Sequence, residues 1–327
     1  MPASNQEDAA VSLGRHLAIV CSPVLAALAA LGEYRLLGDA VPVSQDAVYP
    51  AALGIVLTLA VFLAITSTLW RNFGNAWRYY APLLAGALGV LVLWDLLTQK
   101  LAWLPPFYFP GPPRVLAAIV NDRAILFEST AHSLVLLLTG YGVGVVAGIS
   151  SGVVIGWFPA VRYWSMPALK LIGPLPATAL IPLVMMMSAD SFIPAMVLIG
   201  FAVWFPVTML TSAGIASVRL SHLDVARTLG AGRWYLIFHV ALPSALPHIF
   251  LGLFMGLLAS FLTLIVAEGV GVTAGLGHYL RTQKEAMAYA NFYGALLIIA
   301  IFCSTLLTIL LRVRDRMLRW QIGVLKW

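Results

Sequence analysis

The stretch from residue 140 to residue 156 reads GYGVGVVAGISSGVVIG and has a glycine at every fourth position. Residues four apart lie on one face of an α-helix, so these glycines form a ridge without side chains. Small-residue ridges of this kind let two membrane helices approach until their backbones meet. The stretch therefore predicts a central, tightly packed membrane helix, whose ridge consists of Gly140, Gly144, Gly148, Gly152 and Gly156.

The composition of the whole chain supports a membrane protein. Of its 327 residues, 61% are hydrophobic and 10% are charged, and the mean hydropathy is +0.94. A soluble domain carries about 25% charged residues, because its surface must be wetted. Runs near 20 apolar residues predict membrane spans, so we expect an all-α polytopic membrane protein. The eight expected spans cover residues 17–31, 51–70, 81–97, 132–156, 166–187, 192–215, 245–267 and 292–311.

The basic residues predict the orientation of these spans. With eight spans and a cytoplasmic N-terminus, 13 of the 19 lysines and arginines lie on the cytoplasmic side. Cytoplasmic loops carry such an excess, so both termini are expected in the cytoplasm. The net charge of +6 could also indicate nucleic-acid binding. Arginines beside membrane spans explain the charge better, and we expect membrane lipid, not nucleic acid, around the chain.

The motifs of several enzyme classes are missing from the sequence. No lysine follows a glycine, so the Gly-Lys-Ser/Thr phosphate loop of an ATPase is absent. One G-x-S-x-G pattern occurs at residues 148–152, but it lies inside an apolar helix instead of a strand-to-helix elbow, which disfavours a hydrolase. Cys21 and Cys303 lie in separate apolar runs and predict neither a disulfide nor a metal site. We therefore expect no catalytic, cofactor-binding or metal-binding residue.

Prolines crowd the span predicted over residues 166–187. Pro167, Pro174, Pro176 and Pro182 each remove a backbone donor and kink a helix. Broken helices at membrane depth occur where they are buried in protein or line a watery cavity. Two interpretations stay open, a helix that lines a transport pathway and a helix that is merely kinked for packing.

A polar segment separates the spans at residues 192–215 and 245–267. Ser221 and Asp224 have the spacing of a capping box, which starts a helix. Gly230 is placed to end that helix in a left-handed cap. Residues 233–240 then return as an amphipathic piece, and Pro243 is expected to break the chain before the next span. The segment therefore predicts a short, rigid helical projection from the membrane.

This segment resembles a motif in the permease subunits of binding-protein-dependent ABC importers. The family motif reads Glu-Ala-Ala, three residues, Gly, nine residues, Ile, one residue, Leu-Pro. Every spacing is kept here, with Asp for Glu, Val for the first Ala and Val for Ile. In the family, this loop docks on a separate ATPase subunit. The resemblance therefore implies a coupling role for Asp224, Val225, Ala226, Gly230, Val240, Leu242 and Pro243.

The resemblance extends over about residues 81–320. The five-glycine helix, the prolines at 174, 176 and 182, the Phe205-Pro206 pair and the Ala267-Glu268 pair look like the nitrate, sulfonate, taurine and bicarbonate branch. The resemblance implies a type I ABC importer transmembrane domain with a six-helix core over residues 81–312. Two extra helices would occupy residues 17–80, and residues 1–16 and 313–327 would be cytoplasmic tails. The loop over residues 216–243 would be the coupling segment of the core.

The resemblance also implies partners in a bacterial inner membrane. These are two ATPase subunits that hold ATP and Mg²⁺, a second copy or a sister permease, and a periplasmic or lipid-anchored substrate-binding protein. The chain itself would be no enzyme and would move a small anion such as a sulfonate, taurine or nitrate. An ion-coupled secondary transporter is the alternative, but such carriers normally need a relay of buried ionisable groups, and few occur in these spans.

Further residues are candidates for the pathway or its gate. Met185 begins a stretch that departs from the family pattern, so the substrate class implied by the resemblance would not carry over if this stretch contacts the cargo. Glu268, with Gly275 and Gly277, lies in a glycine-rich stretch that is either a gate or re-entrant element or a flexible connection. The pathway and gate candidates are Pro174, Pro176, Pro182, Met185, Glu268, Gly275 and Gly277.

Overall fold

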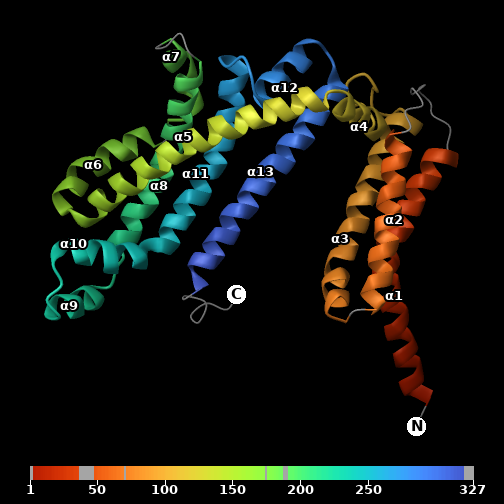
Figure 1. Ribbon diagram of the computed structural model, residues 1–327, viewed down its shortest axis with the longest axis horizontal. Coiled ribbons are helices and arrows are strands. Elements are labelled where there is room, and N and C mark those ends of the chain that lie inside the picture. The colour runs from red at the N-terminus through yellow and green to blue at the C-terminus, as the bar shows by residue number, and fades with distance from the viewer. Residues whose placement is uncertain (1–2, 37–47, 70, 174, 187–190, 320–327) are drawn as a thin grey trace. The chain divides into compact units, whose positions relative to one another are not determined.

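The computed structural model describes residues 3–36, 48–69, 71–173, 175–186 and 191–319. Within these ranges the regular structure is entirely helical (Figure 1), which confirms the predicted all-α class. Seven helices are long and apolar enough to cross a membrane, and one bent helix pair would make an eighth span. Each of the eight predicted apolar runs falls on one of these seven helices or on the bent pair.

The chain divides into two compact units. Unit 1 comprises Met1–Arg123 and Met287–Gly294, and unit 2 comprises Ala124–Ala286 and Ala295–Trp327. Unit 2 contains the glycine ridge, the coupling segment and the glycine-rich stretch after Glu268.

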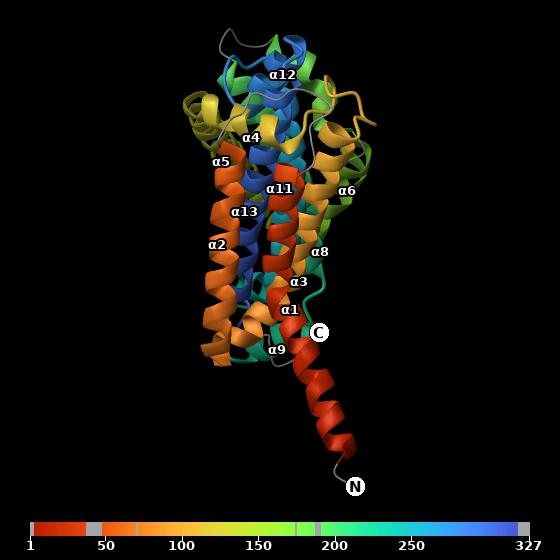
Figure 2. The ribbon, with the colours of Figure 1, turned by 90° about the vertical axis from the view of Figure 1, so that its right-hand side faces the viewer.

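Three helices form most of unit 1. They are α1 (Ala3–Leu36), α2 (Val48–Leu69) and α3 (Arg71–Asp95), which pack side by side (Figure 2). Trp77 of α3 is buried against α1, where its Nε1 donates to the carbonyl of Val20 at 3.2 Å. A buried indole needs such a partner for its N–H, so this bond fixes the register of α3 on α1.

Unit 1 ends in two shorter elements. A π-helical turn, η1 (Leu96–Lys100), follows α3, and α4 (Pro112–Asn121) begins after a loop. The predicted boundary at residue 81 lies inside α3, which packs on both helices of the predicted N-terminal extension. The start of a six-helix core at this residue stays a prediction.

Unit 2 is built on four long helices and several short ones. In Figure 1, α9, α10 and the C-terminal end of α13 lie at one end of the unit, and α7 and α12 lie at the other. The long helices are α5 (Arg123–Trp157), α8 (Phe192–Ala216), α11 (Leu242–Val270) and α13 (Tyr289–Met317). The short elements are α6 (Pro159–Ile172), η2 (Ala177–Leu180), α7 (Ile181–Met185), α9 (Leu220–Thr228), α10 (Arg233–Tyr235), η3 (Leu236–Ala241) and α12 (Leu276–Glu285).

The glycine ridge of α5 lies against α8. A Cβ atom added to Gly148 would stand 2.7 Å from the Cβ of Val207, and one added to Gly152 would stand 2.6 Å from the Cβ of Thr211. Cβ atoms essentially never approach this closely. The other ridge glycines meet α8 in the same register, Gly140 at Ile199, Gly144 at Val203 and Gly156 at Ile215. Two rows of residues, each with a spacing of four, therefore interlock, and only glycine on α5 permits so close a contact.

Helix α11 packs on the same stretch of α8. Gly256 of α11 faces Val203, and Gly252 faces the backbone of Val207. Both valines are fully buried and belong to the largest apolar cluster of the described residues. Helix α8 is therefore held by glycine-assisted contacts from both α5 and α11.

The proline-rich span is broken, as its prolines predict. Helix α6 ends at Ile172, and the pair formed by α6 with the helical residues 177–184 is bent by 79°. Pro167 lies inside α6, whereas Pro176 caps η2 and Pro182 lies in the first turn of α7. A missing N–H has no effect at such helix starts. Pro174 and the side chain of Met185 lie outside the described residues.

A pair of alanine substitutions on α5 tests the ridge. Gly148→Ala places a methyl group against Val207, so we expect overpacking to lower the free energy of unfolding by about 1–3 kcal/mol. Gly142, on the same helix, has no atom within 4 Å of its Cβ position. There, Gly142→Ala should stabilise the helix by about 0.5–1 kcal/mol. Thermal melting of the detergent-purified protein measures both, and equal melting temperatures for the two variants would contradict the ridge.

Candidate functional site

The coupling segment starts immediately after α8. Helix α9 begins at Leu220, and the N-cap is Arg219, whose backbone is extended (φ −61°, ψ 127°) and whose side chain makes no capping bond. The predicted capping box is therefore wrong, because Ser221 already lies inside the helix. An N-cap residue needs an extended backbone, and the short connection from α8 places that conformation at Arg219. The carboxylate of Asp224 instead accepts from Arg227 at 3.0 Å.

Gly230 ends α9 in the left-handed conformation, with φ +86°. The N–H of Gly230 donates to the carbonyl of Arg227 at 2.9 Å, and the N–H of Ala231 donates to the carbonyl of Ala226 at 3.0 Å. These two bonds form a complete Schellman motif, which satisfies the last carbonyls of the helix. The predicted left-handed glycine cap is confirmed.

The chain returns to the membrane as one continuous helix. Gly232 caps α10, and the helical path then runs from Arg233 to Val270. The predicted break at Pro243 is wrong, because η3 widens the helix just before the proline. A π-helical turn has one more residue than an α-helical turn, and Pro243 lies in the first turn that follows it, where its ring and missing N–H are tolerated.

Buried side chains hold the coupling segment on unit 2. Leu223 of α9 is 8% exposed, and Leu236 and Ile237 of η3 are 4% and 2% exposed. On the outer face, Val225 is 60% exposed and Leu229 is 83% exposed. Large apolar side chains on a helix that faces water indicate a surface for another protein.

A groove of about 470 Å³ runs between α9 and the returning helix. The stacked rings of Tyr235 and His239, 4.4 Å apart, form part of its wall. Of the predicted coupling residues, Val225, Ala226, Gly230 and Val240 line this groove, whereas Asp224, Leu242 and Pro243 do not. Leu229, Tyr235 and His239 also line the groove and were not predicted, although an apolar residue just before a capping glycine on a polar helix would have indicated Leu229.

At the other end of unit 2, a buried carboxylate ties three helices together. Glu268 of α11 is fully buried. Its Oε1 accepts from the hydroxyl of Ser133 on α5 at 2.7 Å, and its Oε2 accepts from the N–H of Gly277 on α12 at 2.8 Å. Ser133 also accepts from the N–H of Leu276 at 2.9 Å. The first-turn amides of α12 thus bind the carboxylate and the hydroxyl. The N-terminus of a helix is the favoured place for a negative charge.

The two flanking glycines are required for this contact. Gly275 has φ +104° and caps α12, and the carboxylate of Glu268 occupies the space where a Cβ would lie. A Cβ on Gly277 would stand 2.5 Å from the carbonyl oxygen of Ile265. The structure therefore brings together Glu268, Gly275 and Gly277, and the stretch after Gly275 is a packed helix. Its gating role stays a prediction.

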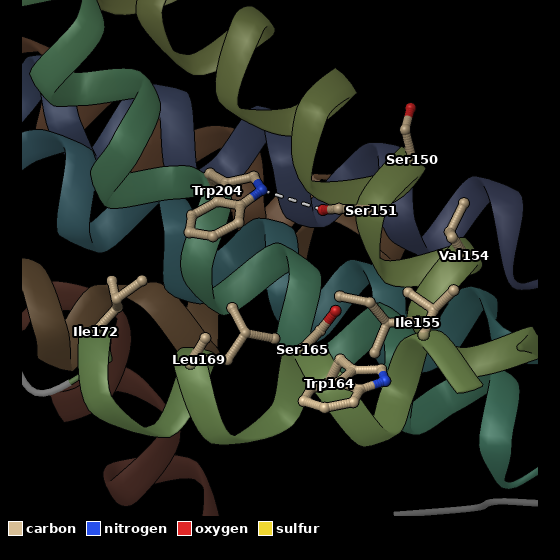
Figure 3. A pocket seen from close by; sticks show the side chains of 11 residues that line it. Ser150, Ser151, Val154, Ile155, Trp164, Ser165, Leu169, Ile172 and Trp204 are labelled. Atoms are coloured by element: carbon tan, nitrogen blue, oxygen red, sulfur yellow. Dashed lines mark hydrogen bonds between the residues drawn. The ribbon is translucent and has the colours of Figure 1, made fainter. Parts of the chain in front are cut away.

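A cleft of about 610 Å³ lies between α5, α6 and α8 (Figure 3). Its walls include Trp164 and Leu169 of α6, and Trp204 of α8. The indole Nε1 of Trp204 donates to the hydroxyl of Ser151 at 3.1 Å, and this hydroxyl also pairs with that of Thr208 at 2.8 Å. Apart from such hydroxyl and indole groups the lining is apolar, and it contains no charged side chain.

The serines of the cleft are helix residues, not nucleophiles. Ser150 donates to the carbonyl of Val146 at 2.7 Å, and Ser151 donates to that of Ala147 at 2.7 Å, as serines inside helices commonly do. Helix α5 is unbroken here, so the elbow that a G-x-S-x-G nucleophile needs is missing. Among the described residues, no group of three or more His, Cys, Asp or Glu side chains is placed to hold a metal ion.

Removing the Glu268 carboxylate should release α12. Glu268→Ala leaves the buried N–H of Gly277 and the hydroxyl of Ser133 without their acceptor, at about 1–3 kcal/mol for each group. We expect faster amide hydrogen exchange over residues 276–280, measured by mass spectrometry. The matched control is Glu285→Gln on the same helix, where an exposed pair with Arg281 is lost and contributes about 0–1 kcal/mol. Unchanged protection of α12 in Glu268→Ala would refute the tie.

Comparison with known proteins identifies the family of this chain. The profile of the binding-protein-dependent transport system inner membrane component matches residues 144–320. The taurine transport system permease protein TauC of Escherichia coli is 31% identical over 258 residues, which are 75% of this chain and 93% of TauC. The putative aliphatic sulfonates transport permease protein SsuC of Bacillus subtilis is 26% identical over 60% of this chain and 71% of SsuC.

A solved structure agrees with this assignment at the level of the fold. A chain of the inward-facing MetNI methionine ABC transporter superposes with a TM-score of 0.50 and 16% sequence identity, over 61% of this chain and 97% of that chain. Most of that chain therefore has a counterpart here. The protein belongs to the family of binding-protein-dependent transport system inner membrane components, as a permease subunit of an ABC importer.

Proposed function

We propose that this permease carries a small anion, such as a sulfonate, taurine or nitrate, and that the coupling segment connects it to separate ATPase subunits. The observation that carries the coupling proposal is the projection formed by α9 and its Gly230 cap. It is anchored by buried Leu223 and presents the exposed Val225 and Leu229. The relatives named for taurine and for aliphatic sulfonates support the substrate class.

A rigid projection can transmit force, whereas a flexible loop cannot. The Schellman motif at Gly230 satisfies the end of α9 internally, and α9 is only three residues from the end of α8. Movement of a bound ATPase would therefore move α8. Nucleotide shifts such an equilibrium only if it favours one state over the other, so closure of the ATPases must accompany one orientation of α9.

The proposed assembly contains two permease chains, identical or paired with a sister chain, and two ATPases that hold ATP and Mg²⁺. This chain would contribute no ATPase site of its own. A periplasmic or lipid-anchored binding protein would deliver the solute. The distribution of basic residues, 13 of 19 on one side, supports cytoplasmic positions for both termini and for α9.

The cleft between α5, α6 and α8 is our candidate for part of the solute pathway. Leu169 is the one buried residue of α6, so most of this helix is open to a second chain or to solute. Hydroxyl and indole groups can bind an anion weakly without a fixed positive charge, and a transported solute must also be released. Pro176 and Pro182, just beyond α6, are exposed and stay pathway candidates, as do Pro174 and Met185.

Helix α12 is proposed to close the outer end of this pathway. Its N-terminus is held by Glu268 and Ser133, residues that come from two different long helices. A relative movement of α5 and α11 would therefore pull on α12 directly. Gly275 and Gly277 allow the close approach on which this contact depends.

Substitution of Gly230 tests the coupling role. A side chain at φ +86° costs about 1–2 kcal/mol, and a β-branched one costs more. We expect Gly230→Val to insert into the membrane normally and to lower solute uptake by about tenfold, because 1.4 kcal/mol corresponds to a factor of ten. ATP hydrolysis should continue without matching uptake. Both rates are measured in proteoliposomes that contain the whole transporter.

The matched control is Gly230→Asn, because asparagine adopts the left-handed conformation far more readily than valine. No atom lies within 4 Å of the Cβ position of Gly230, so the two variants differ in backbone preference and not in packing within this chain. Uptake should be largely restored in the asparagine variant. Full uptake by Gly230→Val would argue against the coupling proposal.

Cysteine labelling tests the cleft as a pathway. In a background with Cys21 and Cys303 replaced by serine, Ser165→Cys places a thiol on the cleft wall. We expect it to react with a membrane-impermeant, negatively charged methanethiosulfonate, and excess transported solute should slow the reaction. Leu171→Cys is the control on the same helix, because Leu171 is 78% exposed but does not line the cleft. Absence of labelling at Ser165→Cys in every nucleotide state would exclude the cleft from the pathway.

A further inference from the structure

A second cavity, of about 670 Å³, lies where several membrane helices of unit 2 end. The span of α5 ends at Trp157 and that of α8 ends at Ala216, and both residues line the cavity. Residues of α6, α9, α10 and η3 also form its wall. The cavity therefore lies where two long apolar helices end and the polar coupling segment begins. It adjoins the groove at Ala231 and shares no lining residue with the cleft.

Three arginines from three elements line this cavity. Arg162 comes from the first turn of α6, Arg227 from α9 and Arg233 from the start of α10. The guanidinium carbon of Arg233 lies over the ring of Phe158, 4.8 Å from the ring centroid. Arg227 forms an exposed ion pair with the carboxylate of Asp224.

The arginines are not neutralised by the wall of the cavity. No Asp or Glu is among the lining residues. The guanidinium of Arg162 has no ion-pair or hydrogen-bond partner among the described residues, and that of Arg233 contacts only the Phe158 ring. Asp224 is the one acidic residue between positions 129 and 267 outside the undescribed segment. Arg162 and Arg233 therefore give the cavity a positive charge that no lining residue compensates.

The other half of the cavity is apolar. Its lining includes Trp157, Ile215, Leu223 and Leu236. A small hydrated anion would gain no favourable contact from these apolar side chains. A ligand that joins a phosphate group to hydrocarbon would satisfy both halves, since guanidinium groups bind phosphate through paired hydrogen bonds.

We propose that this cavity binds the headgroup of an anionic phospholipid. Basic pockets between membrane helices bind such headgroups, and here the phosphate would contact Arg162 and Arg233. The lipid would then bridge the ends of α5 and α8 to the coupling segment. The proposal depends on the cavity and not on the coupling role of α9, because the ligand is recognised by the permease alone.

Lipid titration of the intact transporter tests the proposal. The purified complex in neutral detergent is titrated with short-chain phosphatidylglycerol, with phosphatidylcholine of the same chain length, and with inorganic phosphate, and native mass spectrometry reports the bound molecules. We expect phosphatidylglycerol to bind most tightly. Arg162→Gln and Arg233→Gln should each weaken it about fivefold, since one basic residue near a lipid surface contributes about a factor of five. Arg162→Lys, which keeps the charge, should recover part of the affinity.

Arg219→Gln is the matched control, because Arg219 lies on the same segment and carries the same charge but does not line the cavity. It should leave phosphatidylglycerol binding unchanged. An equal loss of phosphatidylglycerol affinity in Arg219→Gln would show that general surface charge explains the binding, and it would contradict a specific site. Equal binding of phosphatidylcholine, or of inorganic phosphate, would overturn the anionic lipid as the ligand. Transport is not measured here, so failure would leave the Gly230 experiment unaffected.

Discussion

The close approach of α5 and α8 is the constraint on which unit 2 depends. Apolar side chains gain little by packing in a membrane, because lipid tails are equally apolar, so helices associate through dispersion and close backbone contact. The glycines of α5 and the row from Ile199 to Ile215 on α8 provide this contact over four helical turns. Gly252 and Gly256 repeat the arrangement from α11. Substitution of a single ridge glycine would therefore push apart the helices on which the rest of the unit packs.

This packing gives the proposed coupling role a structural basis. Helix α8 passes into α9 after three residues, and the return through η3 leads without a break into α11. Both ends of the segment are thus joined to helices that pack on each other through buried valines. A displacement of α9 has no slack loop to absorb it, so it must be taken up by rotation or bending of α8 and α11 together.

Part of this arrangement was predictable from local sequence, and part was not. The glycine period predicts a packed helix because four-residue spacing is a property of one helix, and Gly230 predicts a left-handed cap for the same reason. The start of α9 and the continuity at Pro243 were predicted wrongly, because a short connection and a π-helical turn depend on the neighbouring helices. The bond between Ser133 and Glu268 joins residues 135 positions apart, and no pattern along the chain indicates it.

Charged side chains in unit 2 are concentrated toward its two ends, and the cleft between them is uncharged. Glu268 is satisfied by neutral donors at one end, three arginines line a cavity at the other, and the cleft between α5, α6 and α8 has hydroxyl and indole groups but no charged side chain. A fixed charge inside a pathway would bind an anionic solute strongly and slow its release. With the cleft as part of the solute pathway, as we propose, selectivity would come mainly from the protein that delivers the solute, and the permease would contribute directional movement instead of strong recognition.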